Sequence, residues 1–466
     1  MISVRRRLRL KKLRFVKVGE NRREFPRLLL IEKLFRGANP RLLCHPGRGP
    51  AVNTSDKLNR GKFLGGTLAA GAMAFGGAPY VMAATKEIVI GLNVPQSGSY
   101  SDQGQDQLRA YKLAIEEINK AGGIMGMQIK ASVGDDQTTP AVATDNARRM
   151  IERDGAVMIT GGSSTGTANA VSSLCQQKKT IFMAALTHGD EPTDSNCHKH
   201  TFRRYINAHM SARAMATELM SKYGTGRWFH ITADYSWGHS VFDNLTAVVE
   251  PKGAKTINNV LLKLGTADFS QALGQAQAAK PDVLVITEFG KDMVNCLNQA
   301  AQFGLTKTTK ILVPLADEYM AKGTGDNMDN VVTTAPFYYK YHAAKYPAAK
   351  KFVAAFMAKY GSPPSNGAEC AYTSLYQYKL AVERAGSINP DAVIKALEGH
   401  KFQATKGPEY WREWDHQSIN SVLVMEGIPM KDRGGDAFAF AKVLQEHDGE
   451  SVAIPRGESK CKIEVA

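Results

Sequence analysis

A loop rich in glycine and hydroxyl side chains, with the sequence GGSSTGT at residues 161–167, is the strongest candidate for chemistry in the chain. It follows an apolar run at residues 156–160 and precedes a helix expected over 167–178. Hydroxyls and free amides at the N-terminus of a helix can hold an anionic group, because that end carries a partial positive charge. No lysine follows in the spacing of a P-loop, which disfavours a nucleotide site. A serine-rich helix cap is the alternative interpretation.

The same loop matches the pattern G-x-S-x-G at residues 162–166. On a turn between a strand and a helix, Ser164 could then be the nucleophile of an α/β hydrolase. This function also needs an acidic residue and a histidine farther along the chain, for which Asp317 and His400 are candidates. Matches of five residues occur by chance, so we keep a secreted hydrolase as an alternative function.

Apolar runs of strand length alternate with helical patterns along most of the chain. Alternation of this kind predicts parallel sheets with helices on both faces. Two such series, separated near residues 201–207, indicate an α/β fold with two doubly wound lobes joined by a multi-strand hinge. Strands are expected over 89–92, 127–133, 156–160, 181–185, 228–233, 260–264, 283–287 and 311–313, and further helices over 346–360, 368–385 and 390–399.

The chain is expected to pass between the two lobes more than once. We assign residues 86–205 and 335–400 to the first lobe, and residues 206–334 and 401–466 to the second. The strand ends of both lobes would meet at a cleft, which is where open α/β sheets bind ligands.

The formal net charge of +15 comes almost entirely from the first 84 residues, which carry 18 Lys/Arg and 4 Asp/Glu. A nucleic-acid-binding protein would carry this charge on its folded part, so nucleic acid is not an expected partner. Residues 57–84 read as a signal peptide, with basic, apolar and small-residue sections in that order. Residues 1–56 form a basic extension that we expect to be disordered or not translated. No other apolar run reaches 18 residues, and we predict a periplasmic protein.

The cysteines and the histidines of one loop region are both interpreted as structural. Of the five cysteines after the signal, Cys175 and Cys197 are the preferred disulfide pair, because both flank one loop system. His188, His198 and His200 lie in the same region without zinc-site spacing, and a polar surface loop is the preferred interpretation.

Several ordered segments resemble the type I periplasmic solute-binding proteins of ABC importers, in the branched-chain amino-acid and amide class. The resemblance covers roughly residues 86–400, and its most specific part is the first segment. The segments are IGLNVPQSGSYSDQGQDQLRAYKLAIEEINKAGGIMG, ITGGSSTGTANAV, TFRR, ITADYSWGHS, TADFSQAL and NQAAQFGL.

The resemblance implies that two lobes close over a small molecule. In that family a carboxylate is held by the serine and threonine residues of the GGSST loop and by a threonine after the next strand. The predicted ligand-binding residues are those at the matching positions, aromatic and polar residues from the other turns, and two acidic residues whose match to the family pattern is ambiguous. They are Tyr100, Gln103, Ser163, Ser164, Thr165, Thr187, Trp237, Phe289, Asp317 and Glu369.

The expected function is therefore capture of a small polar or carboxylate-bearing solute, such as an amino acid, an amide or an aromatic acid. An inner-membrane ABC permease would be the partner of a monomeric protein, and neither a cofactor nor a metal nor a catalytic residue is needed. A periplasmic ligand sensor of the same fold is a further alternative.

Overall fold

The structure is a computed structural model that describes residues 86–223 and 226–463. These residues belong to one compact unit that spans Pro79–Ala466. The predicted basic extension and signal peptide lie outside the described residues. In the described part, no helix combines the length and the apolar character that a membrane crossing needs.

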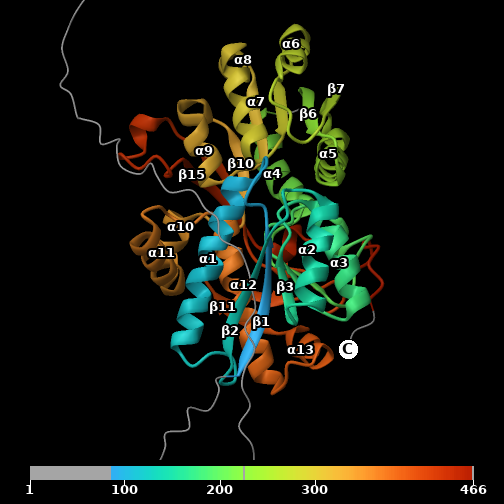
Figure 1. The fold of residues 1–466 in the computed structure, drawn as a ribbon. Coiled ribbons are helices and arrows are strands. Elements are labelled where there is room, and N and C mark those ends of the chain that lie inside the picture. Colours follow the sequence, from blue (N-terminus) through green and yellow to red (C-terminus); the bar gives the residue numbers. More distant parts are fainter. Residues whose placement is uncertain (1–85, 224–225, 464–466) are drawn as a thin grey trace, which may run out of the picture. The chain divides into compact units, whose positions relative to one another are not determined.

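The first lobe is built on a five-stranded parallel sheet with the order β2-β1-β3-β4-β5. Figure 1 shows its strands β2, β1 and β3 side by side. Apolar residues at alternate and consecutive positions of β1 are buried, as expected for a strand covered on both faces. The strands are β1 (Glu87–Val94), β2 (Gln128–Asp135), β3 (Ala156–Gly161), β4 (Ile181–Ala184) and β5 (Thr201–Arg203), and the helices that connect the first four are α1 (Ser101–Lys120), α2 (Pro140–Glu152) and α3 (Thr165–Lys178).

The second lobe contains a seven-stranded sheet with the order β15-β14-β10-β9-β8-β6-β7. Its strands are β6 (Arg227–Ala233), β7 (Lys255–Leu262), β8 (Val283–Thr287), β9 (Lys310–Leu315), β10 (Val332–Ala335), β14 (Val422–Gly427) and β15 (Ala441–His447). Strands β14 and β15 were not predicted from the sequence. They pair antiparallel, so this sheet is mixed rather than fully parallel.

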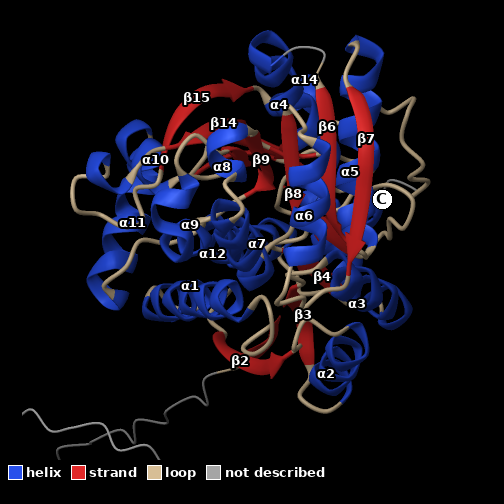
Figure 2. Cartoon of the chain, turned by 90° about the horizontal axis from the view of Figure 1, so that it is seen from above, coloured by secondary structure: helices blue, strands red, loops and turns tan. Residues whose placement is uncertain are grey.

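Helices cover both faces of the second sheet. Right-handed crossovers place the helix between β6 and β7 on one face, and the helices of the three following connections on the other. Figure 2 shows β8, β6 and β7 side by side with helices alongside them. The helices are α4 (Ala208–Tyr223), α5 (Ser236–Val249), α6 (Ser270–Ala279), α7 (Gly290–Gln302), α8 (Leu305–Thr308) and α9 (Glu318–Thr324).

After β10 the chain returns to the first lobe. The long helix α12 (Asn366–Ala385) packs against α1, and the hydroxyls of Tyr372 and Tyr376 both bond Glu117. The neighbouring helices are α10 (Tyr339–Lys345), α11 (Pro347–Tyr360) and α13 (Pro390–Leu397). These elements agree with the helices expected between residues 346 and 399.

Residues 401–419 form a third, small sheet of β11 (Lys401–Ala404), β12 (Gly407–Trp411) and β13 (Ser418–Ile419). A bridge between Arg203 and Gln417 connects this region to β5 of the first sheet, whereas β14 and β15 complete the second sheet. The chain thus crosses between the lobes at residues 204–207, 336–338 and 420–421, and these three crossings form the hinge.

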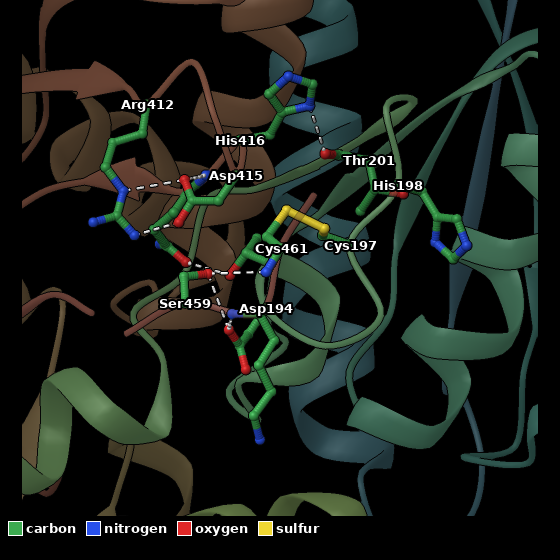
Figure 3. The surroundings of a disulfide bond; sticks show 12 residues. Asp194, Cys197, His198, Thr201, Arg412, Asp415, His416, Ser459 and Cys461 are labelled. Carbon is green, nitrogen blue, oxygen red and sulfur yellow. Dashed lines mark hydrogen bonds and ion pairs between the residues drawn. A yellow bond between two sulfur atoms is a disulfide. The ribbon is translucent and has the colours of Figure 1, made fainter. Parts of the chain in front are cut away.

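One disulfide joins Cys197 to Cys461 across 264 residues, with the two Cα atoms 5.6 Å apart (Figure 3). The predicted Cys175–Cys197 pair is wrong. Cys175 is fully buried in the apolar cluster between α2 and α3, so its thiol faces away from the loop. The C-terminal segment reaches Cys197 because Asp194 accepts hydrogen bonds from Ser459 and from the amide of Lys460.

Candidate ligand-binding cleft

A small cavity lies between the two lobes, at the carboxyl ends of β3, β4, β6, β8 and β9. About 10 Å³ is open to the centre of a water-sized sphere, which is close to the minimum for one water molecule. The lobes are therefore closed on each other. The first lobe contributes Ser163, Thr165, Leu186 and His188, and the second contributes Tyr235, Trp237, Phe289 and Leu315.

The GGSST loop presents one serine to the cavity and uses the next as a helix cap. Ser164 accepts a hydrogen bond from the Thr167 amide at 3.1 Å, and the Thr167 hydroxyl accepts one from the Ser164 amide, which completes a capping box. Ser163 Oγ accepts a hydrogen bond from Gln107 Nε2 at 2.8 Å. Its own proton therefore remains available to a ligand.

The two threonines of this face are engaged with the loops that carry them. Thr165 Oγ1 accepts a hydrogen bond from the Gly189 amide at 3.0 Å and lines the cavity. Thr187 donates its hydroxyl proton to the carbonyl of Gly162 at 2.5 Å, so this proton is already used within the first lobe. The hydroxyls of Ser163 and Thr165 both line the cavity and both accept the hydrogen bonds described above, so either can donate its proton to a ligand carboxylate.

Aromatic side chains from both lobes form the opposite wall. Tyr100, at the start of α1, bonds the hydroxyl of Tyr235 across the lobes at 2.7 Å. Its ring meets Phe289 edge-on, with the centroids 5.1 Å apart, and Phe289 in turn lies 6.1 Å from Trp237. Burial raises the pKa of Tyr100 and Tyr235 well above the ordinary value, so both hydroxyls remain protonated.

His188 is a cavity residue that the sequence analysis placed in a polar surface loop. That interpretation is wrong, because His188 is 3% exposed and His200 is 5% exposed. Trp237 Nε1 donates to His188 Nδ1 at 2.7 Å, and His188 Nε2 lies 2.7 Å from Ser211 Oγ. The position of His188 directly after Thr187, where the chain leaves β4, was the sequence signal that could have identified it as a cavity residue.

Two predicted residues, one acidic and one polar, lie beside the cavity rather than on its wall. Asp317 caps α9, accepting from the amides of Tyr319 and Met320 at 2.9 Å each, and burial raises its pKa to about 6. Gln103 hydrogen bonds to Asp317 from α1, and its buried Oε1 atom has no hydrogen-bond partner within residues 86–223 and 226–463. These two side chains connect the lobes next to the cleft.

Glu288, which lies between β8 and Phe289, was not among the residues predicted for the site. It is 1% exposed, and neither of its carboxyl oxygens has a hydrogen-bond partner among the described residues. Burial, followed by the charge of Asp292, raises the pKa of Glu288 to about 9. Its side chain is therefore neutral at pH 7.

Glu369 is not a cavity residue. It lies on α12 in a fully buried cluster of charges, 3.3 Å from Arg204 Nη2 and 3.3 Å from Lys406 Nζ. Arg204 also bonds Glu409, at 2.8 Å in one of the two contacts. The cluster thereby holds Arg204 in place, which is the residue at which the first hinge crossing leaves β5.

Asp317 and His400, the predicted hydrolase partners of Ser164, are not assembled around it. Its hydrogen bonds are those of the helix cap, Asp317 caps a helix of the other lobe, and the ring of His400 stacks on Phe402. In the described part of the chain, no three His, Cys, Asp or Glu side chains are grouped so that they could hold a metal ion.

Two α/β lobes that close over a partly polar cavity through a three-stranded hinge define a solute-binding protein. The model of a family described as "periplasmic binding protein" matches residues 87–434. Because this match covers most of the chain, the protein belongs to the periplasmic binding protein family.

Individual relatives agree with this assignment. A leucine-, isoleucine-, valine-, threonine- and alanine-binding protein of Pseudomonas aeruginosa is 24% identical over 337 residues, covering 72% of this chain and 88% of its own. A periplasmic binding protein of Burkholderia mallei is 27% identical, with a TM-score of 0.76, over 81% of this chain and 98% of that chain. An ABC-transporter solute-binding protein of Rhodopseudomonas palustris, in complex with 3,4-dihydroxybenzoic acid, has the same fold, at 21% identity and a TM-score of 0.70 over 78% and 98%.

Proposed function

We propose that this protein captures a small carboxylate with an apolar or aromatic body in the periplasm and delivers it to an inner-membrane ABC permease. The cavity carries the proposal. Ser163 and the N-terminus of α3 favour a carboxylate, and the apolar side chains of Trp237, Phe289, Leu186 and Leu315 line the rest of the cavity. The relative from Pseudomonas aeruginosa is named for leucine, isoleucine, valine, threonine and alanine, which are small carboxylates.

Binding would act by shifting the protein toward its closed form. A ligand bonded to both lobes stabilises the closed state by its differential affinity for that state. Micromolar affinity requires about −8 kcal/mol, which a dry cleft with several charge-assisted hydrogen bonds can supply. The closed shape, rather than a chemical change in the solute, would be what the permease recognises, and no catalytic role is proposed for Ser164.

A matched panel of solutes tests the ligand class. Leucine, valine and benzoate, with benzamide as a partner that lacks the charge, would be screened by thermal shift and then by titration calorimetry. We expect at least one of the three carboxylates to raise the melting temperature. We also expect benzoate to bind at least tenfold more tightly than benzamide. If no carboxylate binds, or if benzamide binds as well as benzoate, the proposed ligand class is wrong.

Replacing Ser163 with alanine should weaken binding of that carboxylate by about 10- to 150-fold. A hydrogen bond to a charged group contributes about 1.5–3 kcal/mol, and calorimetry measures the loss directly. Ser173→Ala is the control, because Ser173 lies inside α3, away from the GGSST loop, and donates its hydroxyl proton to the carbonyl of Asn169. Equal affinities of the Ser163 variant and wild type would remove Ser163 from the site.

A further inference from the structure

His188 joins the two lobes through both of its ring nitrogens. It follows β4 of the first lobe, whereas its partners Trp237 and Ser211 lie on α5 and α4 of the second. Ser211 continues the chain of contacts to Thr334 of β10 at 3.0 Å, and Thr334 reaches the carbonyl of Pro314 at 2.6 Å. Opening of the lobes would therefore have to break the bonds of His188.

The partners of His188 determine its protonation. An indole N–H can only donate, so Nδ1 of His188 must accept with a free lone pair, and Nε2 carries the single proton. A second proton could only go onto Nδ1. Two N–H groups would then face each other across the 2.7 Å that separates Nδ1 from Trp237 Nε1.

The surroundings of His188 offer no compensation for a positive charge. Arg203 on β5 adds a positive charge, and its guanidinium bonds Gly189, Thr193 and Gln417. Asp190 directs its carboxylate to the His209 amide of α4 and to Asn244 of α5. The tyrosines that face the ring or share its cavity, Tyr205 and Tyr235, are neutral because burial raises their pKa.

We propose that closure of the cleft is linked to His188, such that the closed, ligand-bound state forms only when this ring is neutral. The inference rests on the proposed function, since it concerns regulation of the same cleft. In an open state the ring would meet water and titrate near its ordinary pKa of about 6.5. In the closed state burial, followed by the charge of Arg203, lowers the pKa of His188 to about 3.

The direction of the effect follows from this difference. The closed state binds fewer protons than the open state between these two values, so closure releases a proton there. Binding is then fully favourable above about pH 6.5 and weakens about tenfold for each pH unit below it, until the closed state itself protonates.

The test is calorimetry of leucine and of benzoate at pH 7.5 and pH 4.5. For a solute that binds, we expect roughly 100-fold weaker affinity at pH 4.5. His188→Asn keeps an acceptor for Trp237 but cannot titrate, so its affinity should change less than threefold over the same range. His239→Asn is the control, because this exposed histidine of α5 pairs with Asp234 within the second lobe and the variant should retain the full dependence.

If the wild-type affinity does not change, or if His188→Asn keeps the wild-type dependence, the proposal is wrong. In the second case another buried group such as Asp317 would be responsible. NMR of the ¹⁵N-labelled histidines provides a second readout, with His188→Asn assigning the signal. We expect the solute-free ring to become charged at or below about pH 6.5, and a bound solute to lower that midpoint by at least one pH unit while the neutral ring keeps its proton on Nε2. A solute-free midpoint above about 6.5, a midpoint that a bound solute leaves unchanged, or a neutral ring protonated on Nδ1 would overturn the proposal.

Discussion

Replacing Glu369 with glutamine should lower the free energy of unfolding by about 3–5 kcal/mol, because it removes one charge from a buried cluster and leaves its partners uncompensated. Glu369, Arg204, Lys406 and Glu409 all have fully buried side chains. Burial opposes ionisation of Glu369, but the charges of Lys406 and Arg204 outweigh this effect and lower its pKa to about 2. Chemical denaturation followed by circular dichroism measures the change.

Glu383→Gln is the matched control for this experiment. Glu383 lies on the same helix and pairs with Lys379 at 2.6 Å near the surface, where such a pair contributes less than about 1 kcal/mol. Equal stabilities of the two variants would contradict the importance of the buried cluster. A large loss of solute affinity by Glu369→Gln at unchanged stability would instead restore the ligand-binding role expected from the family resemblance.

Replacing Cys461 with serine should lower the free energy of unfolding by roughly 2–4 kcal/mol, the usual contribution of a disulfide that closes a long loop. The disulfide does more than anchor the C-terminal end of the chain. Before Cys461, the C-terminal segment pairs Glu458 with Arg213 of α4 in the second lobe, and the disulfide then fixes it to the first lobe. Thermal or chemical unfolding of the two proteins gives the difference.

A thiol reductant provides the control for the disulfide. Wild type should lose about the same stability when dithiothreitol is added, whereas the serine variant should not respond further. Peptide mapping under non-reducing conditions should recover Cys197 linked to Cys461. A peptide that links Cys197 to Cys175 instead would contradict the pairing seen in the structure.

The sequence predicted the repeating elements well because their signals are local. Apolar runs marked the strands β1, β3, β8 and β9, and helical spacing marked α1, α5 and α7. Glycine signals were also readable in physical terms. A Cβ atom at Gly104 would lie 1.7 Å from the carbonyl oxygen of Pro95, so only glycine lets α1 begin this close to the end of β1.

The candidate site was predicted less completely. Tyr100, Ser163, Thr165, Trp237 and Phe289 meet at the cleft or its aromatic wall. Ser164 is a helix cap, and Asp317 caps another helix. His188, which lines the cavity, and the buried Glu288 were not predicted for the site; the position of His188 directly after Thr187 indicated its place, but its contacts with Trp237 and Ser211 depend on packing between the lobes.

The amino-acid sequence by itself determined the α/β alternation, the two series of strands and the turns at which ligand-facing side chains sit. These features depend on residues a few positions apart, so periodicity and turn chemistry are enough to reveal them. The tertiary structure alone decided the partners of Cys197, Glu369 and His188. Their partners come from distant segments, at separations of 264 residues for Cys197, 165 for Arg204 with Glu369, and 49 for Trp237 with His188, and only packing brings such groups together.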